Sequence, residues 1–272
     1  MSHQAYPYII TSQPNTLVVS LADMKKHLKI DSDTTDDEYI ESLISTATKY
    51  VENYIKRELL TKSFKTYRDC FFEPNKLRRS KLQKINSIQY LLDGSLTVFN
   101  SSNYYFDDQV DYSSIYLEEN ASFPSPIDTK KQAVVINFQA GYGFPVSSAT
   151  RSTNVVTITT ESDHNFSSGD EIIIAGAISP ADNDFNGAQT ILVLSSTTFT
   201  YSNTGADETA TGIITANKIP FELLGAIKVI VACLYANRGD CSGDNASLKV
   251  DGCIDPSLRN LLNFYKIIEV TV

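Results

Sequence analysis

The chain has 272 residues, of which 42% are hydrophobic and 20% charged, and its formal net charge is −9. This composition is typical of a globular protein with enough material for a core, and the length suggests about two domains. No apolar run approaches the roughly 20 residues of a membrane helix. No basic segment followed by an apolar one marks a secretory signal. A chain this acidic is also a poor candidate for tight wrapping of nucleic acid.

The first elements are an arm and a short helix. Residues 1–16 are polar and contain two prolines, which predicts an extended arm. Ser20 predicts the N-cap of a helix that runs to about Lys29. The acidic loop from Asp31 to Asp36 lacks the third oxygen ligand and the glycine of an EF-hand. Helix capping therefore explains these residues better than calcium binding does.

The stretch from Asp36 to Leu60 predicts the main helix. Its apolar residues recur at steps of three and four between Ile40 and Ile55, which places them on one face. Thr35 to Glu38 predicts a capping box at its start. The best partner for the apolar face is the segment from Phe221 to Arg238. We therefore expect the two ends of the chain to pack together.

Short strands are expected next, at Phe64–Phe72, Ile85–Leu92, Ser95–Phe99, Asn103–Asp107, Ser114–Leu117 and Gln132–Gln139. The near-continuous apolar run from Ala133 to Phe138 predicts a central strand. Gly141, Gly143 and Pro145 predict a sharp exit from it.

The only basic cluster of the chain follows the first of these strands. It favours contact with DNA phosphates or with an acidic protein surface, although a solvated loop explains it equally simply. Its members are Lys76, Arg78, Arg79, Lys81 and Lys84.

The segment from Val146 to Asn217 differs from the rest in composition. It holds one base and eight acids, a balance of −7, which leaves −2 for the remainder of the chain. Serine and threonine dominate, and β-branched runs recur about every ten residues between turn signals. This pattern predicts a small all-β sandwich or barrel. Its insertion is tolerated easily if its two ends lie close together.

The remaining segments are helical. Proline at residue 220 favours a helix start, and the apolar stripe from Leu223 to Tyr235 predicts a buried face. A last short helix, capped by Asp255, is expected over Ser257 to Ile267. A helix this short is marginal alone, so it must pack on its own domain or on a partner.

The sequence contains no recognisable catalytic or metal-binding motif. The glycine, serine and histidine patterns of hydrolases, zinc proteases and dinucleotide-binding proteins are absent. The four cysteines form no C-x-x-C pair, so we expect free thiols in a reducing compartment and neither a metal nor a redox role. We expect no enzyme activity and no cofactor.

These parts together predict an α+β fold. It comprises a small helical bundle with an antiparallel β subdomain, and an inserted all-β domain. The expected boundaries are 1–16 for the arm, 17–145 with 218–272 for the core, and 146–217 for the insert.

The core resembles the head–tail connector proteins of tailed bacteriophages. The resemblance covers about residues 17–143 and 218–268. It lies in the order of the helices and strands and in several short motifs. These are Ile85-Asn-Ser-Ile-Gln-Tyr-Leu-Leu-Asp-Gly94, Tyr104-Tyr105, Ala140-Gly-Tyr-Gly143, Ile219-Pro220 and Tyr235-Ala-Asn-Arg238. The insert departs from the family and is similar to a β domain that recurs in phage structural proteins, with Val155–Thr160 and Thr198–Tyr201 among its marks.

The resemblance implies a ring, typically of twelve copies, seated below the portal protein in the virion neck and assembled in the host cytoplasm. Such a ring receives the tail or its stopper and continues the DNA channel. No membrane is involved, and DNA passes only transiently. The insert then holds tail fibres, contacts the capsid or braces its neighbours. By analogy with the family, the portal-docking candidates are Leu258, Leu262, Phe264 and Tyr265, whereas packing within the subunit remains the alternative.

A second hypothesis is a binding module. On this interpretation the acidic β insert is an adhesin that recognises a glycan or another virion protein, carried on a helical support. The two hypotheses differ in what purified protein does. An adaptor forms rings only with the portal, whereas an adhesin binds carbohydrate by itself.

Overall fold

A computed structural model describes residues 7–30, 32–71, 75–77, 79, 81–107, 113–125, 127–128, 130–179, 184–238 and 253–267. The chain forms two compact units. The sheet unit comprises Met1–Pro14, Lys56–Tyr142 and Ile267–Val272, and the helix–barrel unit comprises Asn15–Ile55 and Gly143–Lys266. The helices and the barrel thus share a unit, and the predicted domain boundaries stay a prediction.

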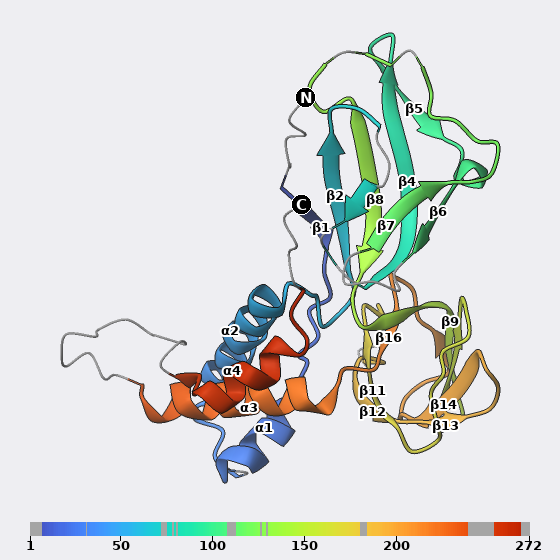
Figure 1. The fold of residues 1–272 in the computed structure, drawn as a ribbon. Coiled ribbons are helices and arrows are strands. Elements are labelled where there is room, and N and C mark those ends of the chain that lie inside the picture. Colours follow the sequence, from blue (N-terminus) through green and yellow to red (C-terminus); the bar gives the residue numbers. More distant parts are fainter. Residues whose placement is uncertain are drawn as a thin grey trace, which may run out of the picture. The chain divides into compact units, whose positions relative to one another are not determined.

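The sheet unit is built on an antiparallel five-stranded sheet of order β1-β2-β8-β4-β5 (Figure 1). The strands are β1 (Ile9–Ser12), β2 (Lys62–Arg68), β4 (Leu82–Leu92), β5 (Ser95–Phe99) and β8 (Val134–Ala140). The run that predicted a central strand is indeed the central one, and all of β8 except Asn137 is buried. The predicted arm is extended but is a paired edge strand over residues 9–12.

A three-stranded sheet of order β3-β7-β6 completes this unit. Its strands are β3 (Asn75–Leu77), β6 (Tyr104–Asp107) and β7 (Ser113–Leu117), and the 3₁₀ turn Ser101–Asn103 precedes β6. One apolar cluster joins side chains of both sheets, including Phe64, Phe138 and Ile115. The sheet unit therefore has a core rich in aromatic side chains between its two sheets.

The helix–barrel unit contains four helices within its described residues. These are α1 (Leu21–Leu28), α2 (Asp37–Ile55), α3 (Phe221–Ala236) and α4 (Pro256–Asn263). α2 packs against α3, as expected from the two apolar stripes, and both contact α1 and α4. None of the described helices is both long and apolar enough to cross a bilayer.

The helix caps agree with the sequence at two of three sites. Ser20 accepts a hydrogen bond from the backbone N–H of Asp23, and Asp255 accepts one from Leu258 at 2.7 Å. The capping box predicted at Thr35 is wrong, because α2 begins at Asp37 and Asp36 is the residue before it. The carboxylate of Asp36 instead reaches the end of α3.

The segment between the sheet unit and α3 folds into a barrel of order β12-β11-β16-β9-β10-β14-β13, and β15 also pairs with β9. Its strands are β9 (Gly143–Ser152), β10 (Val155–Thr160), β11 (Glu171–Ala175), β12 (Gly187–Thr190), β13 (Leu192–Val193), β14 (Thr198–Ser202), β15 (Glu208–Thr209) and β16 (Thr215–Asn217). The expected inserted β fold is thus a nearly closed barrel with its own apolar core.

The first strand of the barrel was missed from the sequence. Gly143 and Pro145 predicted a sharp exit, but both lie in β9. β9 pairs with β16 as far as Pro145 and with β10 from Val146 onward. Proline, which has no N–H to donate, is tolerated there because it lies where β9 changes partner, and its carbonyl accepts a hydrogen bond from the backbone N–H of Glu161 at 2.8 Å. Gly143 pairs with Asn217, so the first and last strands of the barrel are neighbours.

Candidate functional site

The four portal-docking candidates differ in what the fold leaves accessible. Leu262 is fully buried, and Leu258 is half-buried. The hydroxyl of Tyr265 donates to Glu222 of α3 at 3.0 Å. Phe264, in contrast, is 88% exposed. Leu262 and Tyr265 therefore hold α4 within the unit, and Phe264 is the candidate that faces solvent.

A second exposed aromatic residue was not singled out from the sequence. Phe221 is the first residue of α3 and is 79% exposed. It precedes Glu222, which accepts the hydrogen bond from Tyr265, and Tyr265 follows Phe264. Each exposed ring is therefore next in sequence to one partner of the hydrogen bond between Tyr265 and Glu222. The sequence did contain a signal for this exposure, because the predicted buried face of the helix starts at Leu223 and does not include Phe221.

The predicted basic cluster does not form one free surface. Arg79 forms an ion pair with Glu58 at 3.0 Å, and its guanidinium lies over the rings of Tyr8 and Phe64. Its charge is therefore committed within the sheet unit. Arg78 lies outside the described residues.

Three lysines of the cluster reach solvent. Lys76 lies on β3, Lys84 lies on β4, and both are exposed. Lys81 is exposed as well, and its ammonium lies 5.7 Å from the ring centre of Tyr142. These three side chains remain candidates for contact with DNA or an acidic partner.

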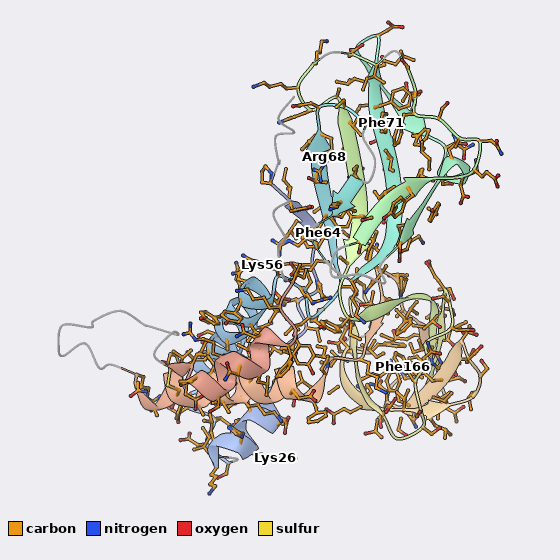
Figure 2. The ribbon with its side chains drawn as sticks, viewed as in Figure 1. Lys26, Lys56, Phe64, Arg68, Phe71 and Phe166 are labelled. Atoms are coloured by element: carbon orange, nitrogen blue, oxygen red, sulfur yellow. A yellow bond between two sulfur atoms is a disulfide. The ribbon has the colours of Figure 1, made fainter. Side chains whose placement is uncertain are left out.

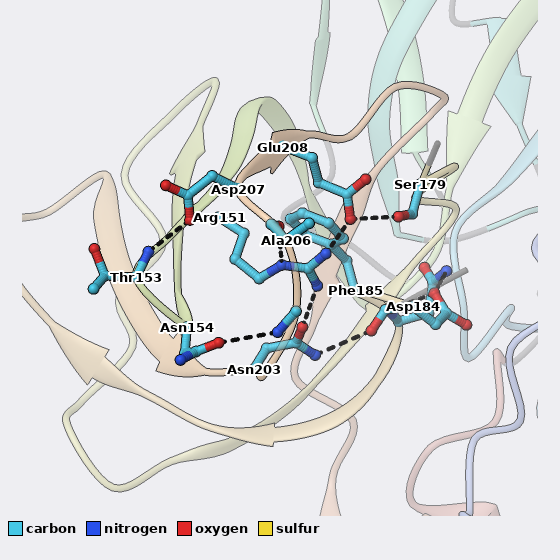
Figure 3. A network of polar contacts seen from close by, with 12 residues as sticks. Arg151, Thr153, Asn154, Ser179, Asp184, Phe185, Asn203, Ala206, Asp207 and Glu208 are labelled. Atoms are coloured by element: carbon cyan, nitrogen blue, oxygen red, sulfur yellow. Dashed lines mark hydrogen bonds and ion pairs between the residues drawn. The ribbon is translucent and has the colours of Figure 1, made fainter. Parts of the chain in front are cut away.

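The barrel contains a buried arginine with several polar partners (Figure 3). The side chain of Arg151 has no exposed surface. Its Nε donates to the carbonyl of Ala206 at 2.7 Å, one Nη donates to Asn203, and the other pairs with Glu208. Its guanidinium also lies 4.8 Å from the ring centre of Phe185. This network fixes the loop before β15 against β9, and we interpret it as structural because the buried charge is held by partners within the barrel.

His164 is the second polar group in the barrel core. Its ring stacks on Phe166 at 4.6 Å and meets the edge of Phe199 at 5.4 Å. Its Nδ1 accepts a hydrogen bond from the backbone N–H of Phe166 at 3.0 Å, which requires an unprotonated Nδ1. Burial lowers the pKa of His164 below its ordinary value of 6.5.

Asp36 joins the start of α2 to the end of α3. It accepts hydrogen bonds from the hydroxyl of Tyr235 at 2.6 Å and from Arg238 at 2.5 Å. The Tyr235 hydroxyl, and then Arg238, lower the pKa of Asp36 below its usual range. Arg238 also lies over the ring of Tyr235. Because this contact forms between segments 199 residues apart, the sequence could not reveal it.

The expectation of free thiols is wrong for two cysteines. Cys233 of α3 and Cys253, which precedes α4, form a disulfide with their Cα atoms 5.6 Å apart. Cys70 is free, and Cys241 lies outside the described residues. In the part of the chain that the structure describes, no group of three or more His, Cys, Asp or Glu side chains could hold a metal ion.

The architecture defines a class of protein before any family comparison: a helical bundle joined to antiparallel sheets and an additional barrel. Chains from the neck and virion of gene transfer agent (GTA) particles share this fold. One, from the neck of the empty particle computed with C6 symmetry, has a TM-score of 0.57 at 12% identity. The chain from the native virion gives 0.55 at 12% identity, and one from the native neck computed with C12 symmetry gives 0.52 at 11%. Each comparison covers 97% of both chains.

The family comparison agrees with the resemblance found in the sequence. Residues 18–87 match the family model of phage gp6-like head-tail connector proteins. A comparison with curated proteins finds no match. The resemblance to head–tail connectors is therefore confirmed. The matched segment spans α1, α2, β2, β3 and part of β4, and it excludes the barrel.

Proposed function

We propose that this chain is a head–tail adaptor of a phage-like particle. Copies form a ring, typically of twelve in this family, that joins the portal to the tail or its stopper and continues the DNA channel. The observation that carries the proposal is the connector match over residues 18–87 within a fold shared along its length with neck proteins. The C6 and C12 symmetry of the related particles supports a ring. Assembly takes place in the host cytoplasm, and the ring is retained in the virion neck.

Portal docking is assigned to the end of α4. Phe264 provides an exposed aromatic anchor, and its position is held by the burial of Leu262 and by the hydrogen bond from Tyr265 to Glu222 of α3. Aromatic anchors dominate the energetics of many protein interfaces. The exposed lysines of the basic cluster contact an acidic partner surface or passing DNA. The barrel contacts a neighbouring copy, a tail fibre or the capsid.

Co-assembly with the portal tests this function. The chain purified alone is expected to be monomeric, and rings are expected in projection images once the portal of the same particle is present. Phe264→Ser is expected to weaken portal binding about tenfold or more, because it removes an interface anchor. Tyr105→Ser, which changes an exposed aromatic residue of the sheet unit, is the matched control and should bind normally.

Two outcomes would overturn the proposal. The first is the absence of rings with the portal, at concentrations where both proteins are soluble. The second is binding of a glycan by the isolated chain together with the absence of any portal complex, which would favour the adhesin hypothesis.

A further inference from the structure

One outward face of the barrel carries hydroxyl side chains in register. Strands β9, β10 and β14 point Ala149, Ile158 and Phe199 inward, so the alternate residues point outward. The outward residues pair in rows across the strands: Thr150 with Thr157 and Thr200, and Ser148 with Thr159 and Thr198. We call this surface the hydroxyl face.

The hydroxyl face has no charged residue among its strand positions, although the segment around it carries eight acids and one base. The carboxylate of Asp207 marks its rim, where it accepts a hydrogen bond from Ser152 at 3.2 Å. Depletion of charge is typical of the centre of a protein interface. The face also has no aromatic residue on which a sugar ring could stack, so it favours a protein partner over a glycan.

An aliphatic margin borders the face at β13. Leu192 pairs with Thr200 of β14 and is 57% exposed, and Leu194 is 60% exposed. Leu194 is held by a hydrogen bond from its N–H to the carbonyl of Thr198 at 2.9 Å. Because the backbone is fixed here, the two leucine side chains stay exposed, as apolar residues at interaction sites do.

A second aliphatic projection, the barrel tip, is formed by Ile178 and Ile213, which are 64% and 49% exposed. The backbones of Ile178 and Thr211 bond to each other in both directions, at 2.8 and 2.9 Å. Gly176 and Gly212 permit this close approach. Both have positive φ, and a Cβ at Gly176 would lie 2.0 Å from the carbonyl oxygen of Ile213. The tip is therefore built rigidly.

The margin and the tip are formed by different segments of the barrel, the margin by β13 and the residue that follows it. β14, β10 and β9 separate β13 from β15, and the tip is formed by the segments that follow β11 and β15. A ring of identical copies requires two different surfaces on each copy that fit one another head to tail. The barrel supplies such a pair.

We propose that the barrels of neighbouring copies contact one another in the assembled ring, with the tip of one barrel packed against the aliphatic margin of the next. This inference rests on the proposed ring function. Barrels with a balance of −7 repel each other, and an uncharged face is where two of them approach at the lowest electrostatic cost.

The size of the surface explains why the contact requires the ring. Strand spacing and residue spacing give the hydroxyl face and margin on the order of 400 Å². Stable interfaces bury about 800 Å² on each partner. A pair of free barrels is therefore too weakly held. Copies already joined in a ring meet at a high effective concentration, and the same contact then forms.

Disulfide trapping in the full chain tests this contact. The variant Ile178→Cys/Leu192→Cys is assembled with the portal, oxidised mildly and analysed by non-reducing electrophoresis, with projection images of the same sample. A ladder of cross-linked copies is expected from the double variant. Each single-cysteine variant controls for the native cysteines. Ile178→Cys/Val98→Cys is the matched control, because Val98 is 62% exposed but lies on β5, outside the barrel. Neither control should give a ladder.

A charge pair provides the second measurement. A single charge in the contact, as in Ile178→Lys or Leu192→Asp, is expected to reduce the fraction of neighbouring barrels in contact about tenfold, because a buried unpaired charge is costly. The combination Ile178→Lys/Leu192→Asp should restore them. Rings without a ladder would overturn this inference alone, as would cross-links to a different virion protein. An absence of rings would overturn the proposed function itself.

Discussion

The sheet unit and the barrel differ in the residues that fill their cores. Both are antiparallel β structures with an apolar core, and the core of the sheet unit contains aromatic rings such as Phe64 and Phe71 (Figure 2). Phe64 also stacks on Phe138, with the ring centres 5.4 Å apart. The barrel instead buries Arg151 and His164 among its aromatic residues. Apolar packing tolerates repacking, whereas a buried charge with several fixed partners permits one arrangement. The sheet unit also buries the charged residues Glu58 and Arg68, but Arg151 of the barrel is the more completely buried cation, at 2% exposure against 8% for Arg68.

The largest expected effect breaks the aromatic core. Phe138→Ala should lower the free energy of unfolding by about 4 kcal/mol, because it leaves a cavity between Phe64 and Tyr8. Denaturant titration with hydrogen exchange at the β8 amides measures the loss. Phe138→Leu is the milder control. Equal protection of the β8 amides from exchange in the wild-type chain and in Phe138→Ala would contradict the prediction that this ring stabilises the sheet unit.

The next effect tests the buried charge. Arg151→Met should lower the free energy of unfolding by about 3 kcal/mol, because Glu208 is left buried without its cation. Hydrogen exchange at the β10 amides localises the loss to the barrel. The double variant Arg151→Met/Glu208→Leu should be more stable than Arg151→Met alone. If it is less stable, the network contributes net stability and the comparison between the two cores fails.

The smallest effect depends on pH. The neutral form of His164 is favoured in the folded barrel, because burial lowers its pKa below the ordinary value of 6.5. The unfolded chain therefore binds the proton more readily, and the free energy of unfolding should fall as the pH drops below about 6.5. His164→Asn should flatten this dependence between pH 6.5 and pH 5 while leaving the dependence below pH 4, where Asp36 and Asp170 titrate. Thermal melts at each pH provide the measurement, and a slope unchanged by the substitution would contradict the assignment.

Local patterns predicted much of the fold because they report local chemistry. The alternation of polar and apolar residues predicted β5 with the limits that the structure has, and the apolar stripes predicted the pairing of α2 with α3. β9 was missed because Pro145 normally ends a strand, and only its change of partner at that residue makes it acceptable.

The site was less predictable than the fold. The disulfide of Cys233 and the bonds of Asp36 join segments that are distant in sequence, so spacing gave no signal. Arg79 looked like a free base because its partner, Glu58, lies 21 residues away in the sequence. Exposure distinguished Phe264 from Leu262, and it depends on how α4 packs. Contact with the portal, with DNA and between copies stays a prediction.

The pairing of Gly143 with Asn217 has a practical consequence for engineering. The polypeptide leaves and returns through adjacent positions of one strand pair, about 5 Å apart. Any compact domain whose own termini are equally close could be grafted there in place of the barrel. A fluorescent or affinity domain placed at this junction would decorate each copy at the same point and allow the copies in a particle to be counted directly.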